Sequence, residues 1–325
     1  MSVPLDIFRA LADPTRLRIF RLLRAMELAV GEIAQVVGQS QPRVSRHVRI
    51  LVEAELVDRR REGSWVFLTP GQGPAARAML DWFDKVPPSA EELLWMDADL
   101  ARLAAVRAER ARAAALYFAE HAEEWDAIRS LHVPEAEVES AMARLFGTRP
   151  LGRLLDVGTG TGRMAELFGS GATSVLAVDR SPDMLRLARA KLPAEESEKF
   201  RLMVGDFNDL PLDDGMVDTA ILHQVLHYAP APDRVVAEVA RVLAPDGVLM
   251  IVDFAPHDLE ELRTRAAHAR LGFSDDQIMA WFAQNGVELT AVEALSGSAL
   301  TVKIWMGCQR HARVRSIREA TGTFR

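Results

Sequence analysis

The N-terminal quarter of the chain has the pattern of a series of short amphipathic helices. Apolar residues recur at helical spacing over residues 5–23, and Asp13–Pro14 interrupts them, which predicts two helices. Residues 30–37 predict a third helix, Gly38 a turn, and Ser40 the N-cap of a fourth helix. Two helices joined by a glycine turn form a supersecondary unit that binds DNA.

A basic hairpin is predicted directly after these helices. The stretch LVDRRREGSWVFLTP predicts two strands around Glu62–Gly63, and Arg59, Arg60 and Arg61 lead into the tip. Such a hairpin after a helix-turn-helix unit is a wing. We therefore assign residues 1–86 to an α+β winged helix-turn-helix domain.

The outward face of the fourth helix carries groups that suit DNA. On a helical wheel, Val44, Val48 and Leu51 form one apolar stripe, and the polar residues point the other way. Guanidinium, hydroxyl and amide groups suit phosphates and the base edges of the major groove. An ordinary solvated helix face is the alternative. With the hairpin arginines included, the candidate DNA contacts are Ser40, Gln41, Arg43, Ser45, Arg46, Arg49, Arg60 and Arg61.

A different pattern begins near residue 150, where short apolar runs alternate with helical stretches. The runs are GRLLDVG, SVLAVDRS, FRLMVGDF, DTAILHQV, GVLMIVDF and ALTVKIWM. Strands that alternate with helices predict a doubly wound, Rossmann-like parallel sheet that binds ligands at the carboxyl ends of its strands. The expected fold class is α/β with an α+β N-terminal domain, and the second domain is assigned to residues 134–309.

Residues 87–133 are expected to connect the two domains. Residues 90–129 are rich in Ala, Leu, Glu and Arg and lack Gly and Pro, which predicts a helix. Tyr117, Trp125 and His132 are interpreted as packing residues, with a lid over a ligand as the alternative.

Charge is distributed unevenly along the chain. The 325 residues carry a net charge of −7, but residues 1–86 hold 13 Lys and Arg against 10 Asp and Glu, so only this part is suited to a polyanion. The basic tail, residues 310–325, is expected to be a flexible end or, alternatively, an arm that contacts DNA. The single Cys308 excludes an internal disulfide. With no signal-peptide pattern and no apolar run of about 18 residues, we expect a cytoplasmic location and no membrane partner.

The stretches LADPTRLRIFRLL, SQPRVSRHVRILVEAELV and RREGSWVFLTP resemble the ArsR/SmtB family of dimeric bacterial repressors over about residues 4–86. The resemblance implies a homodimer that binds double-stranded operator DNA. Family members often sense metals through a cysteine pair, but ELAVGEI has Ala29 and Gly31 at those positions, so no metal is expected. The apolar residues expected at the dimer interface are Ile7, Phe8, Leu11, Met79, Leu80, Trp82 and Phe83.

The stretch LLDVGTGTGRMAEL, residues 154–167, has glycines where a ligand can lie against the backbone. A dinucleotide fingerprint fits it weakly, because only GxGxxA remains. DVGTGTG instead resembles the first motif of class I S-adenosylmethionine-dependent methyltransferases, over about residues 115–308. The ligand implied is S-adenosylmethionine or S-adenosylhomocysteine. The resemblance assigns to its site Asp156, Gly158, Gly160, Gly162, Asp179, Arg180, Met184, Asp206, Phe207 and His223.

This resemblance also implies a role for several of these side chains. Asp179 would accept hydrogen bonds from the two ribose hydroxyls, Met184 would pack on adenine, and Asp206, with Phe207 beside it, would meet the adenine edge. Asp156 would face the ammonium of the methionine portion. The stretch LHQVLHYAP adds residues that orient or deprotonate a substrate, or are structural parts of the pocket. These candidate catalytic residues are His223, Gln224, His227 and Tyr228, together with Tyr117, Trp125 and His132.

Two functions remain open at this point. The first is an ArsR-type transcription regulator whose methyltransferase-like domain binds an adenosyl effector and controls methionine-cycle genes. The alternative is an active small-molecule methyltransferase that carries a DNA-binding domain. In the first case we expect residues 87–133 to couple ligand binding to DNA binding.

Overall fold

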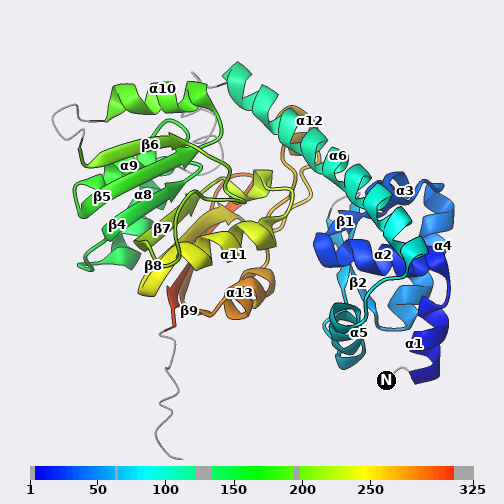
Figure 1. The fold of residues 1–325 in the computed structure, drawn as a ribbon. Coiled ribbons are helices and arrows are strands. Elements are labelled where there is room, and N and C mark those ends of the chain that lie inside the picture. The colour runs from blue at the N-terminus through cyan, green and yellow to red at the C-terminus, as the bar shows by residue number, and fades with distance from the viewer. Residues whose placement is uncertain (1–3, 63–64, 122–133, 193–197, 311–325) are drawn as a thin grey trace, which may run out of the picture. The chain divides into compact units, whose positions relative to one another are not determined.

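The computed structural model describes residues 4–62, 65–121, 134–192 and 198–310. They form two compact units (Figure 1). The N-terminal unit lies within residues 1–120 and also includes two later segments, 227–232 and 255–273. The remaining described residues form the sheet unit. Within the part of the chain described, no helix is long and apolar enough to cross a membrane.

The predicted winged helix-turn-helix elements are confirmed in the N-terminal unit. Asp13 caps the second helix by accepting a hydrogen bond from the backbone N–H of Arg16 (3.0 Å), and Gly38 ends the third helix with φ +68°. The three strands form an antiparallel sheet in the order β1-β3-β2. The elements are α1 (Pro4–Leu11), α2 (Pro14–Ala25), β1 (Leu28–Ala29), α3 (Val30–Val37), α4 (Gln41–Glu53), β2 (Val57–Glu62), β3 (Trp65–Pro70), α5 (Pro74–Lys85) and α6 (Ala90–His121).

The core of this unit gathers the apolar stripes of its helices. Val44, Val48 and Leu51 of α4 are buried, so the opposite face of this helix remains for a partner. The rings of Phe20 in α2 and Phe83 in α5 lie 5.9 Å apart, which joins α5 to the same core. Burial of these stripes supplies the main stabilisation of the unit.

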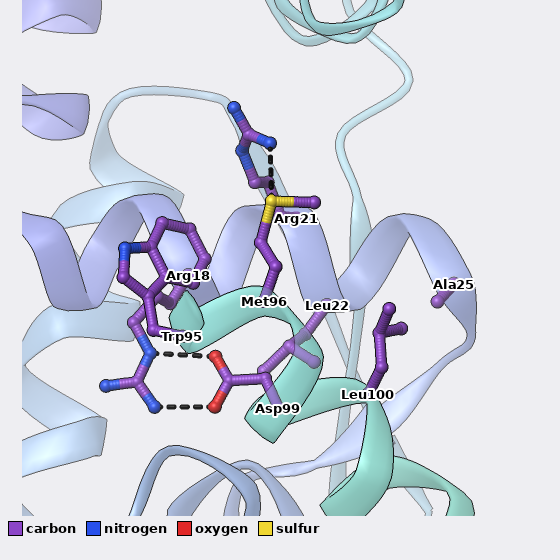
Figure 2. A pocket seen from close by; sticks show the side chains of 8 residues that line it. All are labelled: Arg18, Arg21, Leu22, Ala25, Trp95, Met96, Asp99 and Leu100. Atoms are coloured by element: carbon purple, nitrogen blue, oxygen red, sulfur yellow. Dashed lines mark hydrogen bonds and ion pairs between the residues drawn. The ribbon is translucent and has the colours of Figure 1, made fainter. Parts of the chain in front are cut away.

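Helix α6 is attached to α2 by a charged contact (Figure 2). Arg18 donates two hydrogen bonds to the buried carboxylate of Asp99, from Nε (2.8 Å) and Nη2 (2.6 Å). Beside this pair lies a pocket of about 60 Å³, lined in part by Arg21, Trp95 and Met96. Pockets for drug-sized ligands measure about 300–1,000 Å³, so this one is too small for an adenosyl ligand.

The sheet unit contains a seven-stranded sheet in the order β6-β5-β4-β7-β8-β10-β9 (Figure 1). The strands are β4 (Gly152–Val157), β5 (Ala172–Asp179), β6 (Phe200–Val204), β7 (Val217–His223), β8 (Leu243–Phe254), β9 (Val287–Ser296) and β10 (Thr301–Gln309). The helices α8 (Glu135–Phe146), α9 (Arg163–Gly169), α10 (Pro182–Lys191) and α13 (Asp275–Gln284) pack against these strands. Helix α11 (Pro232–Val242) joins β7 to β8.

The sheet confirms the doubly wound α/β fold but is not parallel throughout. The five strands β4 to β8 are parallel, whereas β10 pairs antiparallel with both β8 and β9. Strand β9 has no counterpart among the strands predicted from the sequence. After the buried Val287, its exposed and half-buried residues alternate, because one face of this edge strand is open to solvent, and such a strand has no continuous apolar run.

The segments 227–232 and 255–273 depart from the sequence-based domain assignment, which placed them inside the second domain. Segment 227–232 comes after β7 and begins within the short 3₁₀ helix η3 (Leu226–Tyr228). Segment 255–273 follows β8 and contains α12 (Glu261–Arg265). The side chain of Ala231 lies in the core of the N-terminal unit. A linear boundary could not identify segment 255–273, because its Arg270 pairs with Glu27, 243 residues away in sequence.

Candidate functional sites

The exposed face of α4 presents basic and polar side chains to solvent. Ser45 turns its hydroxyl back to the carbonyl oxygen of Gln41 (2.9 Å). Ser40 occupies the N-cap position with extended backbone, but its side chain makes no capping hydrogen bond. The exposed predicted DNA contacts on this face are Ser40, Gln41, Arg43, Ser45, Arg46 and Arg49. Three guanidinium groups within two turns give a cationic surface of the kind that binds phosphates and guanine edges.

The arginines of the wing separate onto two faces of β2. Arg59 and Arg61 are exposed, whereas Arg60 points to the opposite side, where its Nη2 donates to Oε1 of the buried Glu27 (3.0 Å). The guanidinium of Arg60 also lies over the ring of Phe67, 5.6 Å from its centroid. The strand period of two explains this difference from the sequence-based assignment, and it directs Arg60 away from the solvent side of the wing.

The glycine loop follows β4 at the point where the strand order reverses between β4 and β7. Such a switch point is where open α/β sheets bind their ligands. Gly158, Gly160 and Gly162 all have positive φ, at +67°, +54° and +84°. A Cβ atom on Gly158 would overlap the side chain of Val225, and one on Gly162 would lie 2.9 Å from the Cβ of Ala188 in α10. At Gly158 and Gly162, a residue without a Cβ atom is therefore required by close packing within the protein itself.

Asp156 fixes the glycine loop through hydrogen bonds of its side chain. Its carboxylate is 1% exposed and accepts hydrogen bonds from the hydroxyl of Thr159 (2.5 Å) and the backbone N–H of Ala165 in α9 (3.1 Å). These contacts tie the end of β4 to the start of α9. The expected contact of Asp156 with a ligand ammonium stays a prediction.

Asp179, the last residue of β5, lies directly beside the glycine loop. Its Oδ2 accepts a hydrogen bond from the backbone N–H of Gly160 (2.8 Å), and its Oδ1 accepts one from the N–H of Ser181 (2.8 Å). Burial raises the pKa of Asp179 above its ordinary value, although the backbone hydrogen bonds act in the opposite direction. The backbone N–H of Arg180 is a third donor to this carboxylate. A carboxylate has about four acceptor positions, so Asp179 retains acceptor capacity for a ligand hydroxyl.

The remaining predicted adenosyl contacts follow the next strand ends. Met184 is 1% exposed within α10, and its backbone N–H donates to the Ser181 hydroxyl that caps this helix (3.3 Å). Asp206, after β6, accepts hydrogen bonds from the backbone N–H (2.9 Å) and side-chain Nδ2 (2.7 Å) of Asn208. Phe207 is half-buried and Arg180 is exposed. Their contacts with an adenosyl ligand stay predictions.

The end of β7 contributes a polar pair in which one partner was not predicted from the sequence. Pairing of Leu222 with Val157 brings His223 next to the glycine loop. The Nε2 atom of the buried His223 lies 3.6 Å from Oε1 of Glu135, in the first turn of α8. The adjacent Gln224 has φ +50°, an uncommon conformation for a residue other than glycine. Glu135 gave no signal of its own, because a glutamate in the first turn of a helix is ordinary.

The structure divides the group formed by LHQVLHYAP between the two units. His223 and Gln224 belong to the sheet unit, whereas His227 and Tyr228 belong to the N-terminal unit. There the ring of His227 lies 4.1 Å from those of Tyr228 and His268. Trp125 and His132 lie outside the described residues, as do the side chain of Tyr117 and the basic tail beyond Arg310.

The single cysteine and the acidic and imidazole side chains offer little for a metal. Cys308 is free and half-buried, and its thiol lies 3.4 Å from the carbonyl oxygen of Asp246. Over the residues that the structure describes, no cluster of three or more His, Cys, Asp or Glu side chains could hold a metal ion.

Comparison with known proteins identifies two domains. Residues 11–60 match a helix-turn-helix domain model, and residues 155–251 match a methyltransferase domain model. An uncharacterized methyltransferase of Mycobacterium tuberculosis is 39% identical over 100 residues, which cover 31% of this chain and 39% of that protein. The malonyl-[acyl-carrier protein] O-methyltransferase of Methylococcus capsulatus is 33% identical over 141 residues, or 43% of this chain and 50% of that protein. The chain thus spans half or less of the length of these two curated relatives.

Among solved structures, the YcgJ protein of Bacillus subtilis is 22% identical with a TM-score of 0.47, and the alignment covers 54% of this chain and 99% of that one. The helix-turn-helix match lies in the N-terminal unit, and the methyltransferase match begins at β4 of the sheet unit and runs through segment 227–232. The chain therefore contains a helix-turn-helix domain and, after it, a methyltransferase domain.

Proposed function

We propose that this protein is a DNA-binding transcription regulator whose methyltransferase domain binds S-adenosylmethionine or S-adenosylhomocysteine as an effector. The observation that carries the proposal is the presence, in one chain, of the exposed arginine face on α4 and the Asp179 carboxylate beside the glycine loop. Methionine-cycle genes are the proposed targets, since both ligands belong to that cycle.

The adenosyl site that we propose uses residues already ordered by the protein. The two ribose hydroxyls donate to Asp179, whose backbone hydrogen bonds fix its orientation. Met184 and Phe207 flank the adenine, and Asp206 accepts from its amino group. His223 and Glu135 lie at the methionine end, where a sulfonium and a neutral thioether differ in charge.

We further propose that the protein acts as a homodimer on a two-fold symmetric operator. Support comes from α1 and α5, which expose Phe8 (63%) and Trp82 (48%) on the surface of the N-terminal unit. Large apolar side chains exposed on one surface are typical of an interface. A two-fold dimer would place two copies of α4 on successive major-groove segments.

The test is an operator titration. Double-stranded DNA that the protein binds is selected from a random-sequence pool. Fluorescence anisotropy then measures the affinity of the protein for this DNA without ligand, with S-adenosylhomocysteine and with S-adenosylmethionine. One ligand should change the operator Kd by about 5–150-fold, the usual range of allosteric coupling. Asp179→Ala should abolish this response and still bind DNA. A parent protein that binds no selected DNA, or whose affinity is the same with either ligand, contradicts the proposal.

A second candidate function is methyl transfer to a small acceptor, and the pair of His223 and Glu135 favours it. An imidazole 3.6 Å from a carboxylate can accept a proton from an acceptor group while the carboxylate stabilises the resulting cation. S-adenosylmethionine, when bound, supplies the activated methyl group. Incubation with labelled S-adenosylmethionine and a panel of small acceptors tests this function, and His223→Asn should abolish any turnover found.

A further inference from the structure

The N-terminal unit contains a buried charge network that includes a residue from the far end of the chain. Nη1 of Arg270 donates to Oε2 of Glu27 (2.7 Å), and the other oxygen of the same carboxylate accepts from Arg60 of the wing (3.0 Å). Arg270 is fully buried and Glu27 is 8% exposed. Because removal of one partner from a buried ion pair leaves an uncompensated charge, this network strongly favours one arrangement of the three residues.

Two arginines of segment 255–273 also pack on the aromatic side chains of the wing. The guanidinium of Arg270 lies 4.5 Å from the ring centroid of Phe67, and that of Arg263 lies 5.0 Å from Trp65 and 5.7 Å from Phe67. Cation–π contacts of this kind strengthen when they are shielded from water. The segment is thus attached to both wing strands, to β2 through the Glu27 carboxylate that Arg60 shares and to β3 through the aromatic rings.

Segment 255–273 is in turn bonded to segment 227–232. The backbone N–H of Arg270 donates to the carbonyl oxygen of His227 (3.0 Å), and the ring of His268 lies 4.1 Å from that of His227. We call these two segments together the strap. Its internal contacts make it one structural element rather than two independent loops.

The strap is covalently continuous with the ends of β7 and β8, and the end of β7 carries His223 of the candidate adenosyl site. Segment 227–232 begins four residues after His223, the last residue of β7, and segment 255–273 begins directly after Phe254, the last residue of β8. If ligand binding shifts these strand ends, the short stretches of chain between them and the strap transmit the movement to the strap. The strap is thus joined through the chain to the end of β7, which carries His223, and it contacts the wing within the N-terminal unit.

We propose that the strap, and not the connecting helix α6, transmits the state of the adenosyl site to the DNA-binding surface. The inference rests on the proposed effector function. Glu27 fixes Arg60 on one face of β2, and the neighbouring Arg59 and Arg61 face solvent on the other, so movement of Arg270 changes where the wing presents its exposed arginines. The effector alters DNA affinity only if it binds one arrangement of the strap more tightly than another.

The experiment compares the strap with the attachment of α6 by matched double substitutions. Glu27→Gln with Arg270→Met neutralises both members of the strap ion pair, and Asp99→Asn with Arg18→Met does the same to the α2–α6 pair. Each double substitution also takes the carboxylate from a second arginine, Arg60 in the strap variant and Arg102 in the α2–α6 variant, so the two variants are matched in this respect. For each full-length protein, calorimetry measures affinity for S-adenosylhomocysteine and S-adenosylmethionine, and anisotropy measures operator Kd with and without each. A third variant, Arg263→Met, removes the cation–π contacts with Trp65 and Phe67 and keeps the Arg270–Glu27 ion pair.

The strap variant should bind both adenosyl ligands as the parent does, but its operator Kd should change by less than about twofold on ligand addition, against the coupling of about 5–150-fold expected of the parent. Arg263→Met should show a reduced response, and the α2–α6 variant should keep the parental one. A full response in the strap variant overturns the inference. Loss of the response in both double variants overturns it too, since the response would then need only an intact N-terminal unit.

Hydrogen exchange provides a readout that does not depend on DNA. Adding the ligand should change exchange of the amides in β2 and in residues 255–273 of the parent, and the change in β2 should vanish in the strap variant. A parent in which the ligand binds but exchange in β2 is unaltered overturns the strap inference. Absence of both ligand binding and DNA binding, by contrast, overturns the proposed function itself.

Discussion

At the scale of single residues, the candidate adenosyl site depends on the local conformations that the chain imposes at strand ends. Asp179 is oriented by the backbone N–H groups of Gly160, Arg180 and Ser181 before any ligand arrives. Preorganisation of this kind removes part of the entropy cost of binding, which makes the residue sensitive to conservative substitution.

The raised pKa of Asp179 predicts a pH dependence of ligand affinity. Only the ionised carboxylate accepts from both ribose hydroxyls, so affinity should fall as the pH decreases from neutrality toward a pKa above the ordinary Asp value of about 3.9. Asp179→Asn should weaken binding by about 1.5–3 kcal/mol at neutral pH and flatten the profile. Calorimetry across the pH range checks both, and a parent profile parallel to that of the variant contradicts the assignment.

The raised pKa of Asp179 also makes the stability of the protein depend on pH. The direction is opposite to that of an acid whose pKa is lowered by a salt bridge. Because the folded protein holds the Asp179 proton more tightly than the unfolded chain, this residue's contribution to stability falls as the pH rises through the interval between the two pKa values. Asp179→Asn should remove that part of the pH dependence, as measured by urea unfolding of the ligand-free protein.

The glycine loop gives a stability prediction at one position. Gly158→Ala adds a methyl group that overlaps Val225 and forces a non-glycine residue into positive φ, so we expect destabilisation of about 1–3 kcal/mol. Gly31→Ala, in α3 with no atom within 4 Å of the added carbon, is the control and should be neutral or stabilising by up to about 1 kcal/mol. Equal denaturation midpoints for the two variants would argue against strain in the loop.

At the scale of elements, α4 and the hairpin are the parts that meet DNA in the proposed function. Burial of one stripe of α4 fixes its orientation in the domain, so its exposed arginines act as a set. The strand period separates Arg60 from Arg59 and Arg61, which gives the hairpin one structural face and one solvent face.

Arg43→Ala with Arg46→Ala should weaken operator binding by about 1–3 kcal/mol for each arginine that binds a base edge. For each arginine that instead neutralises a phosphate, the slope of log K against log salt should decrease in magnitude by about 0.9. Arg186→Ala with Arg189→Ala, two exposed arginines of α10, makes the same change of charge in the other unit and serves as the control. A gel-shift titration that finds equal affinities for both double variants removes α4 from its proposed role.

At the scale of the whole molecule, the proposed dimer should depend on the apolar surface of α1 and α5. Phe8→Ala with Trp82→Ala removes two exposed aromatic side chains and should shift the protein toward monomer at micromolar concentration, with weaker operator binding as a consequence. Leu94→Ala, at an exposed position of α6, is the matched control. Light scattering measures the masses, and a monomeric parent protein rules out this interface.

Much of the fold was predictable from the sequence because it depends on local rules. The break at Asp13–Pro14, the turn at Gly38 and the continuous apolar runs of the parallel strands follow from capping, glycine conformation and burial. The alternating pattern of β9 is also a strand signal, although a weaker one than a continuous apolar run. The inward direction of Arg60 could likewise have been predicted from strand alternation.

The sequence by itself determined the presence of a helix-turn-helix unit and a Rossmann-like sheet, the cationic face of α4, and the positions of Gly158, Asp179 and Asp206 at or shortly after strand ends. These follow from short-range periodicity, which each segment carries within a few residues. Only the tertiary structure decided that Glu135 meets His223 and that Arg270 pairs with Glu27, 243 residues away. Such contacts depend on how separate segments bury their surfaces together, and a buried charge acquires its partner only when that packing is complete.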